Sequence, residues 1–445
     1  MESFALKKKY FTPFRIIVFG FTGIILLGTL LLMLPIASCE KGSASFADAL
    51  FTSTSAVCVT GLVVRDTATY WTLFGQSVIL VLIQIGGLGV VTVAVAVTIL
   101  SGKKIGLIQR STLQEAIAAP QMGGIVKFTN FILRLVLGFE LAGAAAMSPV
   151  FCREFGLAKG IWYSLFHSVS AFCNAGFDLM GVRGQFSSLT SKASNPVINI
   201  TVMLLIIFGG LGFVTWSDIK THGIHFRKYK MQSKVILVSV CILILFPALF
   251  FFIFEYSDLG IKDRVFYSLF QSVTTRTAGF NTADLTLLSG SAQLIFIMLM
   301  LIGGSPGSTA GGMKTTTVAV LFSSAFSVFR RKDSAHFFGR RIPSDAVRTA
   351  ISVFIMYLTL FISGAVIISV AESLPISTCL FETASAIGTV GLTLGITPGL
   401  GLISRTVLVI LMFLGRVGGL TIIFAAQSQH NANVSQLPQE KITVG

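Results

Sequence analysis

Charged residues are scarce in this sequence. Of its 445 residues only 11% are Asp, Glu, Lys or Arg, whereas an ordinary soluble domain carries roughly 25%. Hydrophobic residues make up 53%, which is more than a soluble core can absorb. A lipid bilayer can accommodate them, because a spanning helix needs about 20 apolar residues to cross roughly 30 Å of hydrocarbon. The composition therefore predicts an integral membrane protein.

Motifs typical of enzymes and metal centres are absent as well. The six cysteines show no CxxC spacing, so we interpret them as small apolar fillers rather than as a metal site or a disulfide framework. The sequence contains no HExxH motif, no pair of aspartates in the apolar stretches and no Ser/His pair at a suggestive spacing. These absences argue against an intramembrane enzyme and against an organic cofactor.

What the sequence has in quantity is apolar stretches of membrane-spanning length. Four are free of charge, at 73–100, 197–216, 235–254 and 350–370, and a fifth, 14–34, carries only Arg15 at its second position. Two contain isolated charges, at 131–151 and 407–426, and one is interrupted by Gly, Ser and Thr, at 294–329. Together they predict an all-α integral membrane fold with eight transmembrane helices.

Basic residues are concentrated in every second loop. They precede the first stretch and recur at 103–110, 220–234 and 330–348, while the alternate loops are richer in acid. The net charge of +15 is thus spread over loops rather than over one face of a domain, which argues against nucleic-acid binding. Under the positive-inside rule both termini and the basic loops are cytoplasmic. The acidic external loops would concentrate cations at an outer mouth.

A short pattern recurs four times in the external loops. Each copy reads Leu-Phe-x-Ser/Thr-x-Ser/Thr, and the copies begin at Leu50, Leu165, Leu269 and Leu380. A glycine follows the Phe by ten residues in three copies and by nine in the third: Gly61, Gly176, Gly279 and Gly391. Each copy is too short and too polar to span, so it must enter the membrane and return. We predict four re-entrant half-helices, in repeats at 14–100, 125–218, 235–329 and 346–426, followed by a cytoplasmic tail at 427–445.

The segments that end in these glycines form the predicted ion site. They are Val57, Cys58, Val59, Thr60 and Gly61, then Cys173, Asn174, Ala175 and Gly176, then Arg276, Thr277, Ala278 and Gly279, then Gly388, Thr389, Val390 and Gly391. Non-helical backbone at membrane depth is tolerated only around a cavity, and these side chains include no ring of carboxylates. The expected ligands are backbone carbonyl oxygens, which replace the water shell of K⁺. Half-helices whose C-terminal ends face the centre would add the negative end of their dipoles.

The stretch at 294–329 would be roughly 54 Å long as one helix, so it must break. It contains the run Gly303, Gly304, Ser305, Pro306, Gly307, Ser308, Thr309, Ala310, Gly311, Gly312, Met313 and Lys314, and Gly and Pro prevent a continuous helix. We expect this intramembrane gating loop, residues 303–314, to lie below the ion site and to obstruct the passage when closed. The run nearly matches the phosphate-binding pattern GxxxxGK[ST], but Met313 separates Gly312 from Lys314 and no strand precedes it, so nucleotide binding is disfavoured.

Two arginines and four glycine pairs complete the candidate residues. Arg416 lies in the last apolar stretch, where a charge costs several kcal/mol. It either faces the passage as an electrostatic barrier or donates hydrogen bonds between helices. Arg276, beside the third glycine, is expected to pair with Glu382 or another acid at the mouth. Paired glycines indicate close helix packing or bending, which their spacing does not separate, at 86–87, 209–210, 303–304 and 418–419.

These motifs resemble the Ktr/Trk/HKT superfamily of potassium transporters, and within it the membrane subunits of bacterial Ktr uptake systems. The resemblance covers nearly the whole chain and rests on the four repeats and their glycines. It implies four M1-P-M2 repeats around one pseudo-fourfold, potassium-channel-like pore. It also implies that Gly61 favours K⁺ over Na⁺, and that Arg416 matches an arginine of the family's last helix near the intramembrane loop.

The resemblance further implies partners and a location. Such subunits form homodimers seated on a cytoplasmic RCK/KTN ring of the KtrA type, which binds ATP and ADP, and the basic loops would dock this ring or contact membrane lipid. After Ala426 we expect only a short polar tail, with no room for a nucleotide-binding domain. The expected function is K⁺ uptake across the bacterial plasma membrane, with Na⁺ dependence left open. The alternative is a Na⁺/K⁺ symporter or a less selective monovalent cation channel, whereas a transporter with inverted repeats is disfavoured because the four repeats share one orientation.

Overall fold

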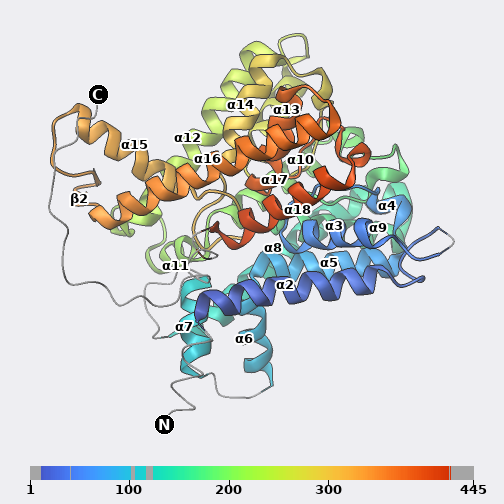
Figure 1. Ribbon diagram of the computed structural model, residues 1–445, viewed down its shortest axis with the longest axis horizontal. Helices are drawn as coiled ribbons and strands as arrows, with labels where there is room; N and C mark the ends of the chain where they lie inside the picture. The colour runs from blue at the N-terminus through green and yellow to red at the C-terminus, as the bar shows by residue number, and fades with distance from the viewer. Residues whose placement is uncertain (1–11, 41, 102–105, 117–123, 420, 422–445) are drawn as a thin grey trace.

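The computed structural model describes all of the chain except residues 1–11, 41, 102–105, 117–123, 420 and 422–445. The predicted tail at 427–445 lies outside the described residues, as do Lys103 and Lys104 of the second basic loop. The described part is mainly helical (Figure 1). The sheet in this described part has two short antiparallel strands, β1 (His336–Phe337) and β2 (Arg340–Arg341).

Four long helices run through the molecule. They are α2 (Pro13–Leu32), α8 (Ile125–Phe155), α12 (Met231–Phe250) and α16 (Ser344–Glu372). Pro247 lies inside α12, and the chain then continues as the π-helical segment η4 (Phe251–Glu255), as expected where a proline removes a helical hydrogen bond. Among the described residues, these four, with η4 extending α12, are long and apolar enough to cross a membrane.

A short helix follows each long one and packs against it: α3 (Phe46–Val57), α9 (Leu157–Phe172), α13 (Ile261–Thr274) and α17 (Ile376–Gly388). A third helix then completes each group. These outgoing helices are α5 (Leu73–Leu88), α10 (Pro196–Gly210), α14 (Gly290–Leu301) and α18 (Leu402–Val417). We refer to the four groups as units 1 to 4 in chain order.

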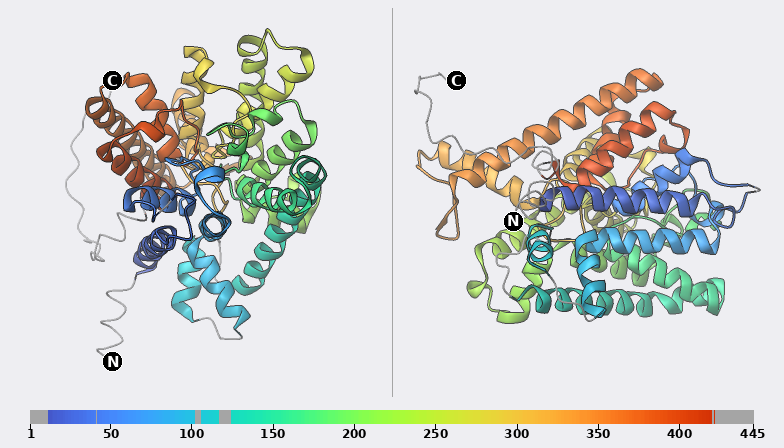
Figure 2. Two further views of the ribbon diagram at one scale, coloured as in Figure 1. Left: turned by 90° about the vertical axis from the view of Figure 1, so that its right-hand side faces the viewer. Right: turned by 60° about the horizontal axis from the view of Figure 1, so that its bottom comes forward.

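The four units form a closed ring. The outgoing helix of each unit packs against the short helix of the next, in the pairs α5 with α9, α10 with α13, α14 with α17 and α18 with α3. The last pair joins unit 4 to unit 1, although the two units lie at opposite ends of the sequence. Figure 2 (left) shows the chain, from blue to red, following this circuit around a centre.

Two predicted spans differ in shape from the expectation. The sequence predicts single helices at 73–100 and 197–216, but the structure has two bent pairs, in which α5 turns by 95° into α6 (Val90–Leu100) and α10 turns by 95° into α11 (Phe213–His222). Gly89 and Gly212 lie at the bends with φ of +85° and +86°, a conformation that only glycine adopts readily. Counting each bent pair as one span raises the number of candidate spans among the described residues to six, so eight crossings remain a prediction.

The expected break at 294–329 is present. The outgoing helix α14 ends at Leu301 and α15 (Thr315–Phe329) begins after the intervening loop. The remaining short elements lie in the connections within and between units: α4 (Thr67–Tyr70), α7 (Leu107–Ala116), η1 (Met180–Val182), η2 (Thr190–Lys192), η3 (Phe226–Lys228), η5 (Leu285–Leu287) and η6 (Thr397–Gly399).

Burial reverses the usual pattern of a soluble protein. Large apolar side chains are exposed on the outer helices, including Leu30, Leu141, Leu245 and Val366. The short helices are instead buried and rich in hydroxyls, such as Ser53, Ser168 and Ser272. Such an apolar exterior suits contact with lipid. All six cysteines are free, and three of them, Cys58, Cys173 and Cys379, are buried.

Candidate functional site

The four repeated glycines meet at the centre of the ring. A Cβ built on Gly61 would lie 3.1 Å from the Cα of Gly176, and one on Gly176 would lie 2.9 Å from the Cα of Gly279. In the same way Gly279 faces Gly391, and Gly391 faces Gly61. Each of the four has a positive φ, between +68° and +93°. No side chain fits at these positions, so we call the four residues the glycine ring.

Carbonyl oxygens close the glycine ring between units. The oxygens of Ala175 and Ala278 approach Gly61 and Gly176, so each comes from the residue that precedes the glycine of the following unit. The oxygens of Val390 and Thr60 approach Gly279 and Gly391 in the same sense. Four backbone carbonyls therefore lie at one level, one from each unit.

A left-handed residue lies two positions before every ring glycine. These residues are Val59, Asn174, Thr277 and Thr389, with φ between +51° and +63°. This conformation costs roughly 1–2 kcal/mol for a residue with a Cβ, and it recurs in all four units, so it belongs to the shared design of the segments. The predicted segments start slightly early, because Val57 and Gly388 are still the last residues of α3 and α17.

The hydroxyls of the repeated pattern hold these segments in place, a role that sequence reasoning missed. At the last position of the Leu-Phe-x-Ser/Thr-x-Ser/Thr pattern, Ser55 and Ser385 accept hydrogen bonds from the N–H groups of Gly61 (3.1 Å) and Gly391 (3.0 Å). Ser170 and Thr274 instead donate to the carbonyls of Phe177 (2.7 Å) and Phe280 (2.5 Å). The fourfold Ser/Thr repetition is the signal that could have predicted this.

The first hydroxyl of the pattern anchors the short helix to the long one. Ser53 donates to the carbonyl of Ile25 at 2.7 Å, Ser168 to that of Glu140 at 2.6 Å and Ser272 to that of Ile244 at 2.6 Å. In unit 4, Thr383 instead donates within its own helix, to Cys379 at 3.0 Å. The pattern thus encodes both the anchoring of the short helix and the shape of the segment after it.

A cavity of about 210 Å³ opens on one side of the glycine ring. All four ring glycines line it, together with the carboxylates of Asp66, Asp178 and Asp284. We call this cavity the vestibule. Burial raises the pKa of Asp178 to about 7, so the negative charge in the vestibule falls as the pH drops through neutrality. Acids at this position would attract cations toward the ring.

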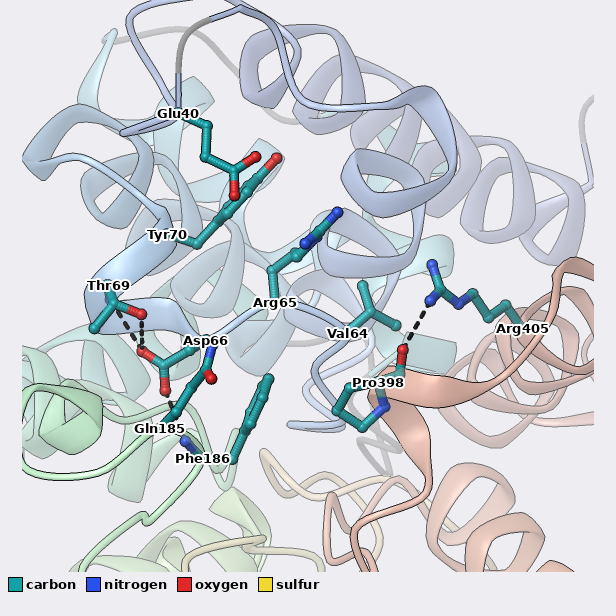
Figure 3. A pocket seen from close by; sticks show the side chains of 10 residues that line it. All are labelled: Glu40, Val64, Arg65, Asp66, Thr69, Tyr70, Gln185, Phe186, Pro398 and Arg405. Atoms are coloured by element: carbon teal, nitrogen blue, oxygen red, sulfur yellow. Dashed lines mark hydrogen bonds between the residues drawn. The ribbon is translucent and has the colours of Figure 1, made fainter.

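A side pocket adjoins the vestibule and shares Asp66, Phe186 and Pro398 with it (Figure 3). Asp66 accepts hydrogen bonds from the N–H groups of Thr69 (2.9 Å) and Phe186 (3.0 Å), which ties unit 1 to unit 2. At the other end of the pocket, Arg405 donates to the carbonyl of Pro398 at 3.0 Å.

Asp48 joins the first and last units. This buried carboxylate of α3 pairs with Arg65 of unit 1 at 3.0 Å and with Arg405 of α18 at 2.8 Å. The hydrogen bond to Asp48 raises the pKa of Arg65. Asp48 therefore bridges units 4 and 1, the junction of the ring at which the two units are not consecutive in the sequence.

The expected pairing of Arg276 with Glu382 is wrong. Glu382 accepts hydrogen bonds from Thr393 (2.8 Å) and from Thr397, and Arg276 forms no ion pair with any residue that the structure describes. The Arg276 side chain lines a small cavity with Ile206 and Val240 of neighbouring helices. The side chain thus lies beside apolar residues of these helices, a placement that spacing alone does not reveal.

The loop at 303–314 packs against the predicted ion site, on the side opposite the vestibule. Thr309 donates through its hydroxyl to the carbonyl of Phe172 at 3.0 Å and through its N–H to that of Gly209 at 3.2 Å. Gly312 donates to the carbonyl of Gly415 in α18 at 3.2 Å. A Cβ on Gly311 would overlap the side chain of Thr389. The loop thus contacts segments of units 2 and 4.

The two ends of the loop meet, and Lys314 follows them as the residue that precedes α15. Ile302 pairs with Met313 in an isolated parallel bridge, and Gly303 donates to the Met313 carbonyl at 2.7 Å. Lys314 donates to the carbonyl of Ala310 at 2.9 Å. This hydrogen bond ties the end of the loop to its own backbone, just before α15 begins.

Arg416 lies between the loop and unit 1. Its guanidinium donates to the carbonyl of Thr309 in the loop and to the carbonyls of Gly86 and Gly87 at the end of α5. Arg416 thus lies near the loop, as expected. It also donates hydrogen bonds that link separate elements, which was the second of the two roles considered for it. The guanidinium charge therefore lies directly beside the loop.

The paired glycines serve both packing and bending. A Cβ on Gly86, Gly209 or Gly415 would overlap the carbonyl oxygen of Val57, Phe172 or Ile387, at the ends of three short helices. The glycines two to three residues later, Gly89, Gly212 and Gly418, have positive φ and end the helices. In units 1 and 2 a paired glycine therefore packs against a short helix, and the bend lies at the glycine just after the pair. In unit 4 the packing glycine is instead Gly415, which precedes the predicted pair at 418–419.

A buried carboxylate behind the second segment was missed by the sequence reasoning. Glu140 of α8 accepts a hydrogen bond from Gln84 at 3.3 Å, and the Cys173 sulfur lies 3.9 Å from its other oxygen. The sequence shows only a charge in an apolar stretch. Gln84 and Cys173 are 56 and 33 residues away along the chain, so no local pattern announces the cluster.

Comparison with known proteins identifies the family. The family of TrkH cation transport proteins matches residues 6–436. The chain belongs to the TrkH family of cation transport proteins. This family is one of transporters and not of enzymes, which confirms both the expected superfamily and the expectation that the chain is not an enzyme.

Several known proteins resemble the chain over nearly all of its length. The potassium/sodium uptake protein NtpJ of Enterococcus hirae is 41% identical, and the match covers 98% of each chain. The Ktr system potassium uptake protein B of Bacillus subtilis is 37% identical over 98% of this chain and 97% of its own. The crystal structure of the potassium transporter TrkH from Vibrio parahaemolyticus shares the fold, with a TM-score of 0.73 and 20% identity over 93% of this chain and 84% of that one.

Proposed function

We propose that the protein takes up K⁺ across the bacterial plasma membrane as the ion-translocating subunit of a Ktr-type system. The observation that carries this proposal is the glycine ring, in which four units present backbone carbonyls at one level. Full-length relatives named as potassium uptake proteins support it. In this proposal each unit is an M1-P-M2 repeat, the short helices are pore helices, and eight helices cross the membrane with both termini cytoplasmic.

The segments before the ring glycines would act as a selectivity filter. Their carbonyl oxygens replace the hydration shell of K⁺, and the C-terminal ends of α3, α9, α13 and α17 add partial negative charge. The hydroxyls of Thr60, Thr277 and Thr389 are buried and have no hydrogen-bond partner among the described residues. Buried polar atoms are normally satisfied, and water or cations in the passage would satisfy these.

Flux through reconstituted liposomes tests the proposal. We expect K⁺ and Rb⁺ to enter much faster than Na⁺ and Li⁺, driven by an inside-negative potential worth about 2.3 kcal/mol per charge at 100 mV. In Gly61→Ser the preference for K⁺ should fall, because the added side chain would meet the carbonyl of Ala175. Gly156→Ser is the matched control, since Gly156 also has a positive φ but open space around its Cα.

Two outcomes would count against this function. Rb⁺ entry at the level of empty vesicles, even with the cytoplasmic partner and nucleotide supplied, would exclude transport. Equal entry of Na⁺ and K⁺ would favour the alternative of a Na⁺/K⁺ symporter or a less selective cation channel, in keeping with the name of the potassium/sodium uptake protein NtpJ.

The loop at 303–314, with Arg416, would form the gate. It packs beneath the filter segments of units 2 and 4, and Arg416 holds it to the end of α5. Deleting residues 304–312 should increase flux, and Arg416→Gln should increase it as well, because glutamine cannot bind all three carbonyls. Arg134→Gln, in an exposed arginine of α8, is the control. Unchanged or lower flux in folded protein would contradict the gating role.

Regulation would come from other chains. We propose a homodimer that docks on a cytoplasmic RCK/KTN ring of the KtrA type, which binds ATP and ADP. The name of the B. subtilis relative, a component of a Ktr system, supports a partner subunit. The basic loop at 220–234 and the later part of the loop at 330–348, with Arg340, Arg341 and Arg348, would supply the contact surface.

A further inference from the structure

A deep apolar groove runs between α12 and α15. Its volume is about 800 Å³, the largest of the cavities described here. One wall is formed by Val238 and Ile242 of α12 and the other by Phe322 and Phe326 of α15. All four side chains are substantially exposed, and Phe322 is 62% accessible. Because α12 is long and apolar enough to span a membrane, this groove opens toward hydrocarbon.

One end of the groove is strongly basic. Arg330, Lys332 and His336 line it just beyond the end of α15, and all three are exposed. None of them forms an ion pair with a residue of the described part of the chain. No acidic residue lines the groove. The basic end belongs to a loop that the positive-inside rule places in the cytoplasm.

The dimensions fit one lipid of a single leaflet. Thr315 and Arg330, at the two ends of the groove, are separated by 15 residues, which is roughly 22 Å along a helix. One leaflet of hydrocarbon is roughly 15 Å thick, so the groove has length for acyl chains and for a headgroup beyond them.

We propose that this groove is a binding site for an anionic phospholipid. The acyl chains lie between α12 and α15, and the phosphate contacts Arg330, Lys332 and His336. Charge complementarity selects the ligand class, because a basic cluster without acidic partners favours an anionic headgroup over a zwitterionic one. The exposed phenylalanines select lipid over a water-soluble anion.

The site also has a route to the loop at 303–314. Ile302 and Thr315 line the deep end of the groove, and they flank the loop on its two sides. Ile302 forms the bridge to Met313 that closes the loop at its neck. A bound acyl chain therefore touches both attachments of the loop, and its presence would shift the open fraction. This regulatory consequence rests on the proposed function, whereas the binding does not.

Binding is tested by fluorescence quenching in vesicles. Phe322→Trp, or Phe326→Trp should the first fold poorly, places a fluorophore in the groove, and the signal of the three native tryptophans is subtracted. In phosphatidylcholine vesicles, brominated phosphatidylglycerol at low mole fraction should quench it strongly, and brominated phosphatidylcholine at the same fraction should not. With Arg330→Gln and Lys332→Gln added, the half-quenching fraction of phosphatidylglycerol should rise about tenfold. Arg340→Gln with Arg341→Gln, nearby on β2 but outside the groove, should leave it unchanged.

Three results would overturn the site. Equal quenching by both brominated lipids would mean an ordinary lipid-facing surface. Loss of quenching in the β2 control as well would mean a general effect of surface charge. No quenching by either lipid, with a dimer in detergent, would mean that a second copy covers the groove.

Measurements of Rb⁺ flux distinguish a failure of the proposed lipid site from a failure of the proposed transport function. In the parent protein, phosphatidylglycerol should change Rb⁺ flux at least threefold relative to pure phosphatidylcholine, and Ala319→Phe, which fills the groove, should abolish this response. A lipid response that survives Ala319→Phe would refute the coupling to the loop. Absent flux in every vesicle with selective quenching retained would refute the transport proposal and leave the lipid site intact.

Discussion

Single hydroxyl groups define the backbone next to the glycine ring. Ser55 and Ser385 accept the N–H of a ring glycine in units 1 and 4. In Ser55→Ala the buried N–H of Gly61 would lose its acceptor, at a cost of about 1–3 kcal/mol. We expect a lower K⁺ preference over Na⁺ in liposome flux, because the carbonyl positions in this segment would loosen.

The control for this prediction is Ser77→Ala. Ser77 is a half-buried residue of α5 whose hydroxyl donates within its own helix, to the Leu73 carbonyl. It should leave both selectivity and stability close to those of the parent. An unchanged K⁺ to Na⁺ ratio in Ser55→Ala would show that the hydroxyl has only a packing role.

Single residues also mark how far sequence reasoning reaches. The ring glycines were identified because their spacing repeats four times, and Arg416 was identified because a charge in an apolar stretch is costly. The direction of the Arg276 side chain was predicted wrongly, and the Glu140 cluster was missed. Both depend on residues distant in the chain, and no local pattern reports such contacts.

At the scale of elements, glycines set how closely helices approach. A Cβ on Gly86 would overlap the Val57 carbonyl at the end of α3. Gly86→Ala should therefore destabilise the protein by about 3 kcal/mol or more, because α5 or α3 must shift. The measurement is the thermal unfolding midpoint in detergent, together with the fraction of monodisperse protein.

Gly138→Ala is the control for this substitution. Gly138 lies in α8 with no neighbouring atom within 4 Å of an added Cβ, so alanine should be neutral or stabilise the helix by about 0.5–1 kcal/mol. Equal midpoints for the two variants would contradict the packing argument.

Helix shape was the element-level property that the sequence predicted least well. Apolar content correctly indicates helices at 73–100 and 197–216, but hydropathy carries no information on φ. The 95° bends depend on Gly89 and Gly212 adopting positive φ. The loop at 303–314 was easier to predict, since its length and its Gly and Pro residues exclude a continuous helix.

At the scale of the whole molecule, the ring must be closed without a covalent connection between units 4 and 1. Asp48 contributes to this closure through Arg405 and Arg65. In Asp48→Asn both charged hydrogen bonds weaken, at a cost of about 1–3 kcal/mol. We expect a lower unfolding midpoint and also a reduced K⁺ preference, because α3 leads directly to the first filter segment.

Glu154→Gln provides a matched comparison. Glu154 also pairs with two basic residues, Arg183 and Lys192, but all three belong to unit 2. It should lower the midpoint without changing the K⁺ to Na⁺ ratio. A selectivity change of the same size in both variants would show that Asp48 has no special role in closing the ring.

The fourfold architecture was the most predictable feature of the whole molecule, since four copies of one pattern between apolar stretches leave few arrangements. The order of the units around the centre and the pairing of each outgoing helix with the next short helix came only from the structure. They depend on which faces of the helices fit together, and apolar residues of similar size fit in many ways.

In the part of the chain that the structure describes, a loop like that at 303–314 occurs in one unit only, and so does the arginine that contacts it. Four identical chains arranged around an axis would bring four such loops and four guanidinium groups to one place. The space there is too small for four loops, and the four positive charges would repel one another. Joining the copies in one polypeptide removes that restriction, so natural variation can alter one copy at a time. Covalent continuity thus allows one copy to carry the loop and another copy to carry the arginine that contacts it.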